Sequence, residues 1–161
     1  MQLLGELRCH SGTHDVDIKV FVPDTDYSTI RNVIRGTFPA RARPHVPENP
    51  LIVAVNIDGV IVDFLLALPG YEENIITRAV KRDLDEFSVW VSSAEDLIIQ
   101  KVVAGRGKDW LDVEALLLEQ WGQLDEGYID DWLMQFAEAL VRPELLSEYK
   151  LIYEKVTNIP R

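Results

Sequence analysis

Cysteine is almost absent from the sequence, and so is any long apolar run. The single cysteine, Cys9, excludes a framework of intramolecular disulfides and is typical of a protein kept in a reducing compartment. The most apolar stretch, VIVDFLLALP, contains Asp63 and has only about half the length that a membrane-spanning helix needs. The first ten residues, MQLLGELRCH, lack the apolar core of a signal peptide. These absences predict a cytoplasmic protein without a membrane anchor.

Positive charge is also scarce. The 161 residues include 16 Lys and Arg against 27 Asp and Glu, which gives a formal net charge of −11. Most of such a surface repels nucleic acids and anionic membranes. A nucleotide or RNA partner must therefore use a local basic patch or a metal ion. One strongly basic stretch is present, and it either binds such phosphates or pairs with the protein's own acids; it comprises Arg31, Arg35, Arg41 and Arg43.

Pairs of cysteine and histidine that could bind zinc are scarce as well. The segment CHSGTH supplies Cys9, His10 and His14. A structural zinc site needs four ligands, usually in two spaced pairs, and the chain has no second pair. The sequence therefore argues against a zinc site.

The character of the sequence changes near Ser92, from segments rich in strand formers to segments with helical spacing. VDIKVFV is typical of a strand, and a helix is expected to follow it, with a cap at residues 24–26 and a stop at Gly36. LIVAVNIDGVIVDFLLAL predicts a central β-hairpin, because Asp58-Gly59 is the dipeptide that a type I′ turn prefers. A short edge strand is expected at 42–46, a short helix in GYEENIITRAV and a further strand in EFSVWV.

Four helices are expected after Ser92. The first has a capping-box pattern, Ser92-x-x-Glu95, and a stop at Gly105; the second is closed by Gly122. Two more follow in DEGYIDDWLMQFAEAL and RPELLSEYKLIYEKV. Large aromatic residues recur at helical spacing and are expected in the core: Trp110, Trp121, Trp132 and Phe136.

The order of these segments predicts an α+β fold with a mixed sheet flanked by helices and a helical C-terminal half. We expect residues 1–92 to form the sheet core and residues 93–161 to form a helical portion packed on it as one compact unit.

Three acids stand in apolar strands where acids are uncommon. Asp15 and Asp17 alternate with apolar residues, so their side chains should share one face of a strand, with Val16, Ile18 and Val20 on the other. Neighbouring carboxylates repel unless a cation lies between them, and Mg²⁺ prefers such hard oxygen ligands. Asp63 interrupts the second arm of the hairpin and could complete the cluster. The alternative is that Asp15 and Asp17 only solvate the end of the strand.

The stretch THDVDIKV, the hairpin with an acid in its second arm and the later segment SAEDLIIQKVVAGRGKDWLDVEALL resemble the nucleotidyltransferase superfamily of the DNA polymerase β type. The resemblance covers about residues 5–120 and is greatest to the small prokaryotic proteins grouped with the AbiEii-type toxins. It implies that Asp15, Asp17 and Asp63 bind Mg²⁺ and a nucleoside triphosphate, with Asp63 also a catalytic residue. The later family pattern matches Glu95, Asp96, Lys101, Arg106, Asp109 and Asp112.

Basic residues of the later segment are the candidates for binding the triphosphate. Lys101 lies at the edge of an apolar helical stripe, where it either reaches into a cleft or extends to solvent. Arg106 and Lys108 flank a loop, and either could contact phosphate. Asp109 and Asp112 fall in the first turn of a helix, where a capping role is expected of acids.

One family feature is missing. Relatives carry a Gly-Gly or Gly-Ser turn before the paired acids, which brings backbone N–H groups to the triphosphate, whereas MQLLGELRCHSGTH has no such step before a helix. Either the start of the chain lies further upstream or the phosphate cradle has been lost.

Two functions are therefore expected. The first is Mg²⁺-dependent transfer of a nucleoside monophosphate from a nucleoside triphosphate to a protein, RNA or small molecule, with a toxin role and a cognate antitoxin implied by the resemblance. The second is a non-catalytic module that keeps the fold and binds a partner, such as another copy of itself.

Overall fold

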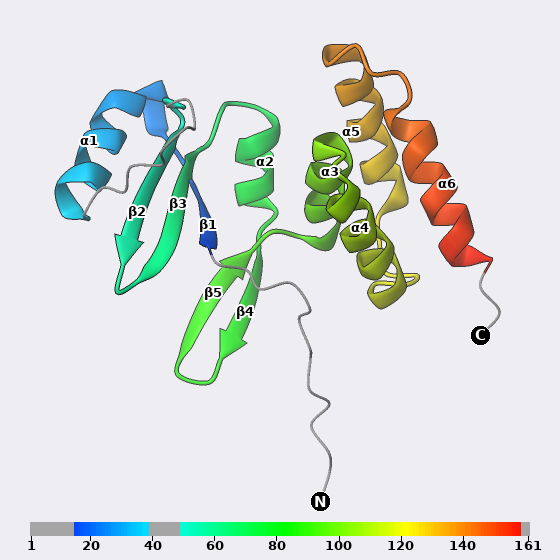
Figure 1. Cartoon of the computed structure of the whole chain (residues 1–161), viewed down its shortest axis with the longest axis horizontal. Helices are drawn as coiled ribbons and strands as arrows, with labels where there is room; N and C mark the ends of the chain where they lie inside the picture. Colours follow the sequence, from blue (N-terminus) through cyan, green and yellow to red (C-terminus); the bar gives the residue numbers. More distant parts are fainter. Residues whose placement is uncertain (1–14, 39–48, 159–161) are drawn as a thin grey trace, which may run out of the picture. The chain divides into compact units, whose positions relative to one another are not determined.

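The computed structural model describes residues 15–38 and 49–158, apart from the side chain of Asp15. The fold is α+β, as the sequence predicts, with strands in the first half and helices dominating the second (Figure 1). The chain divides between Ile76 and Thr77 into two compact units, each described below by itself. The expectation that a sheet core of 1–92 and a helical portion of 93–161 pack as one unit stays a prediction. The strand expected at 42–46 lies outside the described residues.

The first unit contains a three-stranded sheet in the order β1-β3-β2. Strand β1 (Asp15–Val20) runs parallel to β3 (Val60–Leu66), and β2 (Ile52–Ile57) pairs with β3 in the antiparallel sense. Parallel neighbours need a long connection, which here includes helix α1 (Tyr27–Thr37). Strand β3 is therefore central among the described strands, and the acid that interrupts it lies in the middle of the sheet.

The predicted hairpin turn is confirmed. Ile57 pairs with Val60, so Asp58 and Gly59 form a two-residue loop. Their φ angles are 51° and 90°, and positive values at both positions are what a type I′ turn requires. Asn56 also accepts a hydrogen bond from the backbone N–H of Gly59, at 2.9 Å. This turn fixes the register between β2 and β3.

Helix α1 follows a short 3₁₀ turn at Pro23–Thr25 and begins as the sequence predicts. The Asp26 carboxylate accepts a hydrogen bond from the backbone N–H of Thr29 at 3.1 Å, and hydrogen bonds from Thr29 lower the pKa of Asp26. The buried core of this unit comprises Val22, Ile34, Val53, Val55, Val62 and Leu66. The unit ends with helix α2 (Tyr71–Thr77).

The second unit begins with a hairpin of β4 (Val80–Leu84) and β5 (Phe87–Val91). Strand β5 matches the predicted strand in EFSVWV, but β4 was not predicted. Its sequence, VKRDL, carries three consecutive charged residues, and four of its five side chains are exposed. An exposed strand has no buried face, so it lacks the apolar alternation by which strands are recognised.

Four helices complete the second unit: α3 (Ala94–Ala104), α4 (Gly107–Glu119), α5 (Glu126–Ala139) and α6 (Leu145–Thr157). Gly105 ends α3 in the left-handed conformation, as predicted. The cap at the start of α3 is Ser93, one residue after the predicted Ser92, and its hydroxyl accepts from the N–H of Asp96 at 3.1 Å. The sequence SSAED fits the capping pattern at both positions, so the pattern could not decide between them.

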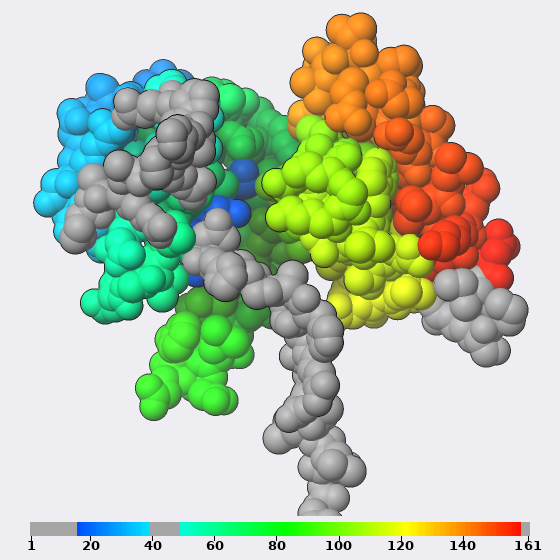
Figure 2. Space-filling model, viewed as in Figure 1, coloured from blue at the N-terminus to red at the C-terminus, as the bar shows by residue number. Residues whose placement is uncertain are grey.

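The helices pack closely against one another (Figure 2). Their fully buried side chains are mainly aliphatic, with Tyr149 the largest. The expectation that the aromatic residues form the core is only partly right, because Trp110, Trp121, Trp132 and Phe136 are half-buried. No helix in the described part of the chain is long and apolar enough to cross a membrane.

Candidate functional site

Asp17 and Asp63 are direct neighbours in the sheet of the first unit. In the parallel pairing of β1 with β3, the register sets Asp17 opposite Asp63. Residues opposite each other on neighbouring strands project from the same face, and the strands are about 4.8 Å apart. The structure thus brings together two of the three acids that the sequence singled out. Asp15 lies two residues before Asp17 on β1, opposite Ile61, and its side chain lies outside the described residues.

The opposite face of the sheet carries the apolar side chains. Val62 and Leu66 of β3 are buried in the core, and Val20 of β1 packs against them. Val16 and Ile18 share this face, but their exposed fractions are 47% and 40%. The prediction that they build the core is therefore wrong, because β1 is an outer strand of the described sheet. The acids nevertheless lie on the face away from the buried core, which they share with Ile61 and Leu65 of β3.

The two acids differ in their surroundings. Only 5% of Asp63 is exposed, because β3 is flanked by β1 and β2, whereas Asp17 on the outer strand is exposed. The residue opposite Asp63 on the other side is Ala54, which has a small side chain. Two residues after Asp17, on the same face, Lys19 donates to Glu72 of α2 at 2.8 Å. This face thus carries one deep carboxylate and one that reaches solvent.

Carboxylate oxygens of this kind fit a hard divalent cation. Mg²⁺ typically takes one or two protein carboxylates and completes its shell with water and phosphate oxygens. Within the described side chains, no group of three or more Asp, Glu, His or Cys residues gathers around one point. The described part of the cluster is therefore a pair, with Asp15 next to it along the strand. Cys9, His10 and His14 lie outside the described residues.

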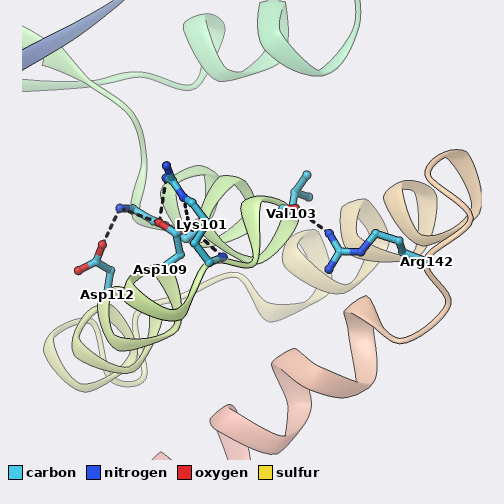
Figure 3. A network of polar contacts seen from close by, with 6 residues as sticks. Lys101, Val103, Asp109, Asp112 and Arg142 are labelled. Atoms are coloured by element: carbon cyan, nitrogen blue, oxygen red, sulfur yellow. Dashed lines mark hydrogen bonds and ion pairs between the residues drawn. The ribbon is translucent and has the colours of Figure 1, made fainter. Parts of the chain in front are cut away.

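The candidate triphosphate ligands lie in the second unit, at the junction of α3 and α4 (Figure 3). Asp109 is fully buried, and its carboxylate accepts from the side chain of Arg106 at 2.6 and 3.1 Å and from the Arg106 backbone N–H at 3.1 Å. The Lys101 ammonium lies 2.6 Å from Asp112 and 3.5 Å from Asp109. The capping role expected of Asp109 is confirmed, and Lys101 and Arg106 both pair with acids of α4.

The charges in this network reinforce one another. The hydrogen bond to Asp112 raises the pKa of Lys101, and the hydrogen bond to Asp109 raises the pKa of Arg106. The hydrogen bonds from Arg106 lower the pKa of Asp109 despite its burial. On the far side of α3, Arg142 donates to the carbonyl of Val103 at 2.9 Å, which satisfies one of the carbonyls left over at the end of the helix (Figure 3). Arg142 thus stabilises the end of α3, and Arg106 stabilises the start of α4.

Asp109→Asn should lower the free energy of unfolding of this helical unit by about 2 kcal/mol at pH 7, because it removes a charge-assisted pair and a helix cap. Since the pKa of Asp109 is lowered on folding, its charge stabilises the native state above the ordinary value of 3.8 and ceases to do so as pH falls through the folded value. The difference between wild type and variant should therefore shrink below about pH 4.

Urea unfolding followed by tryptophan fluorescence measures this effect, because all four tryptophans lie in the second unit. Asp112→Asn is the matched control: Asp112 pairs with the same lysine but is 44% exposed, so its loss should change stability by at most about 1 kcal/mol. Equal losses for the two variants, or a difference that does not depend on pH, would contradict the assigned role of Asp109.

Lys108 differs from Lys101 and Arg106 in its surroundings. Lys108 is exposed and forms no hydrogen bond or ion pair with described residues. In the basic stretch, Arg31 and Arg35 belong to α1, whereas Arg41 and Arg43 lie outside the described residues. Of the three predicted nucleotide ligands, Lys108 is thus the one whose ammonium is not already paired with an acid of the described residues.

Sequence reasoning missed a buried polar cluster around Asp96. This carboxylate is fully buried and accepts from the hydroxyl of Tyr128 at 2.7 Å and from that of Ser93 at 2.8 Å. The guanidinium of Arg78 stacks over the Tyr128 ring at 3.8 Å and lies 3.5 Å from Asp96. The signals in the sequence were the match of Asp96 to the later family pattern and its position beside apolar residues in the first turn of α3. Its partners are too distant in the sequence to be recognised.

One family of proteins matches most of the chain. A family model described as a nucleotidyltransferase of unknown function (DUF6036) matches residues 4–156. This match covers both units, including the two acids of the sheet and the α3–α4 corner. No curated protein is significantly similar to the chain. The chain belongs to this family of nucleotidyltransferases of unknown function.

Proposed function

We propose that the first unit carries a Mg²⁺-dependent nucleotidyltransferase site in which Asp15, Asp17 and Asp63 hold the metal and its bound nucleotide. The observation that carries this proposal is the register of the sheet, which sets Asp17 beside Asp63 on the face away from the apolar core. Two carboxylates at neighbouring positions repel, and a cation between them removes the repulsion. When bound, the ion neutralises phosphate charge and lowers the pKa of an attacking hydroxyl.

The reaction that suits this site is transfer of a nucleoside monophosphate. A hydroxyl oxygen of the acceptor forms a bond to the α-phosphorus, the bond from that phosphorus to the bridging oxygen breaks, and pyrophosphate leaves. Asp63 receives the proton of the hydroxyl as the general base. This role requires the acceptor to bind with its hydroxyl next to the Asp63 carboxylate. Asp17, on the exposed strand, faces the solvent side from which the nucleotide enters.

Binding of the triphosphate by Lys101, Arg106 and Lys108 is a further part of the proposal. Lys108 supports it best, because its ammonium is exposed. Lys101 and Arg106 are already paired with Asp112 and Asp109, so contact with phosphate requires them to exchange or share these partners. The acceptor class, the toxin role with a cognate antitoxin and the cytoplasmic location rest on the sequence and its resemblance to AbiEii-type proteins.

Thermal unfolding of the protein with ATP, GTP, CTP or UTP and Mg²⁺ tests whether the site binds nucleotide. At a nucleotide concentration of 100 times the dissociation constant, binding stabilises the native state by about 2.7 kcal/mol, which raises the melting temperature by several degrees. At least one nucleotide should do so with Mg²⁺ and not with EDTA. If all four fail with Mg²⁺ present, the proposal is wrong, and the chain is better explained as a non-catalytic module.

A further inference from the structure

The β4–β5 hairpin is a small sheet with two outer edges. It contains only these two strands, and no described strand pairs with the outer edge of either one. Isolated two-stranded hairpins are marginally stable in water, and an uncovered edge offers unpaired N–H and C=O groups to another strand. This part of the structure therefore has the geometry that accepts an additional strand.

One face of the hairpin is apolar and open. Because side chains alternate along each strand, the register of β4 with β5 places five apolar residues on this face: Val80, Leu84, Phe87, Val89 and Val91. Phe87 is 64% exposed and Leu84 is 48% exposed. Arg82 is the one charged residue among them. This face is therefore apolar up to the outer edge of β4, where an added strand can place its own apolar side chains beside Val80 and Leu84.

The sequence of β4, VKRDL, is complementary to itself around Arg82. If two copies of β4 pair in the antiparallel sense about a two-fold axis at Arg82, Lys81 lies opposite Asp83 of the second copy, and Asp83 lies opposite Lys81 of the second copy. The same register sets Val80 opposite Leu84 of the second copy. Opposite charges and apolar pairs at facing positions stabilise antiparallel strands. A two-fold interface uses each favourable pair twice.

We propose that two copies of this chain associate edge to edge through β4, which joins the two hairpins into one four-stranded sheet. The apolar faces of the hairpins then become continuous across the new strand pair. Charges on an outer strand usually prevent such pairing, and a net charge of −11 on each copy opposes association in general. In β4, however, the order of the signs turns the charged residues into complementary pairs.

Within one copy, Lys81 lies 3.4 Å from Asp83 on the same face of β4, and Asp83 accepts from the hydroxyl of Ser88 at 2.6 Å. Both charged side chains are more than half exposed, so they can be shared with a second copy at little expense. The unfavourable element is Arg82, which lies opposite Arg82 of the second copy. This repulsion should limit the affinity, and its removal should strengthen the dimer.

Sedimentation velocity of the full chain over a range of micromolar concentrations tests the proposal. The wild type should show a reversible dimer. Asp83→Lys and Lys81→Asp should each weaken it by about tenfold or more, because each variant sets like charges opposite each other twice. The double variant K81D/D83K should restore the dimer, since the opposite signs face each other again. Arg82→Thr should tighten it, a gain that misfolding cannot imitate.

Every other outcome overturns the proposal. A wild type that stays monomeric at all concentrations rules out the association. A dimer that responds to neither single exchange uses another surface, such as the outer edge of β5. Failure of an equimolar mixture of the two single variants to dimerise, when each has a circular dichroism spectrum equal to that of the wild type, would show that the singles act through the Lys81–Asp83 contact within one copy. Only the mixture sets opposite charges across the strand pair without restoring that contact.

Discussion

Asp63→Asn should reduce nucleotide transfer by at least about 100-fold. Loss of a group that only supports a metal ligand already costs about 10- to 100-fold in activity, and Asp63 is proposed to be a ligand itself. The substitution keeps the shape of the side chain but removes both a negative ligand and the group that receives the proton. Asp63 occupies the central strand, is 5% exposed and lies directly opposite Asp17. Any growth arrest caused by expression of the protein should disappear with this substitution.

The measurement is the transfer of label from an α-³²P nucleoside triphosphate, chosen as the one that stabilises the protein with Mg²⁺, to protein, RNA or small molecules of a cell extract. Asp58→Asn is the matched control, since it removes the same charge from the same hairpin but lies at the turn, where asparagine tolerates the φ of 51°. Activity in Asp63→Asn close to that of Asp58→Asn would remove Asp63 from the mechanism.

Asp96→Ala should lower the free energy of unfolding of the helical unit by about 3–5 kcal/mol, the usual loss when one member of a buried ionic network is removed. Two hydroxyls donate to this fully buried carboxylate, and Arg78 lies 3.5 Å away. Without Asp96, the hydroxyls of Ser93 and Tyr128 lose an acceptor inside the protein, and the buried nitrogen of Arg78 loses its counter-charge.

Urea unfolding followed by tryptophan fluorescence reports this loss. Asp131→Ala is the control, because Asp131 is exposed on α5, and its substitution should change stability by less than about 0.5 kcal/mol. Tyr128→Phe removes only one of the hydrogen bonds and should fall between the two. A loss for Asp96→Ala as small as that for Asp131→Ala would show that the buried cluster does not stabilise the unit.

The residues that could be recognised from the sequence are those whose role depends on near neighbours. The turn at Asp58-Gly59, the cap at Asp26 and the stop at Gly105 are all determined within a few residues, and the structure confirms them. Asp63 was recognisable because an acid in an apolar strand is unusual.

The features that no local pattern specifies depend on residues far apart in the chain. The register that sets Asp17 opposite Asp63 arises from parallel strands joined through α1 and β2, and no local pattern specifies it. Asp96 is fully buried, and one of its hydrogen-bond donors, Tyr128, lies 32 residues away in the sequence. Strand β4 is exposed, so burial left no pattern in its sequence.

Mn²⁺ binding followed by electron paramagnetic resonance shows whether Asp17 and Asp63 hold a divalent cation together. Mn²⁺ substitutes for Mg²⁺ at carboxylate sites, and the signal of the free ion falls when it binds. We expect the wild type and Asp58→Asn each to bind one Mn²⁺ ion. The affinity of Asp17→Asn and of Asp63→Asn for Mn²⁺ should be at least about tenfold weaker. Equal Mn²⁺ affinity in all four proteins would contradict this role of Asp17 and Asp63.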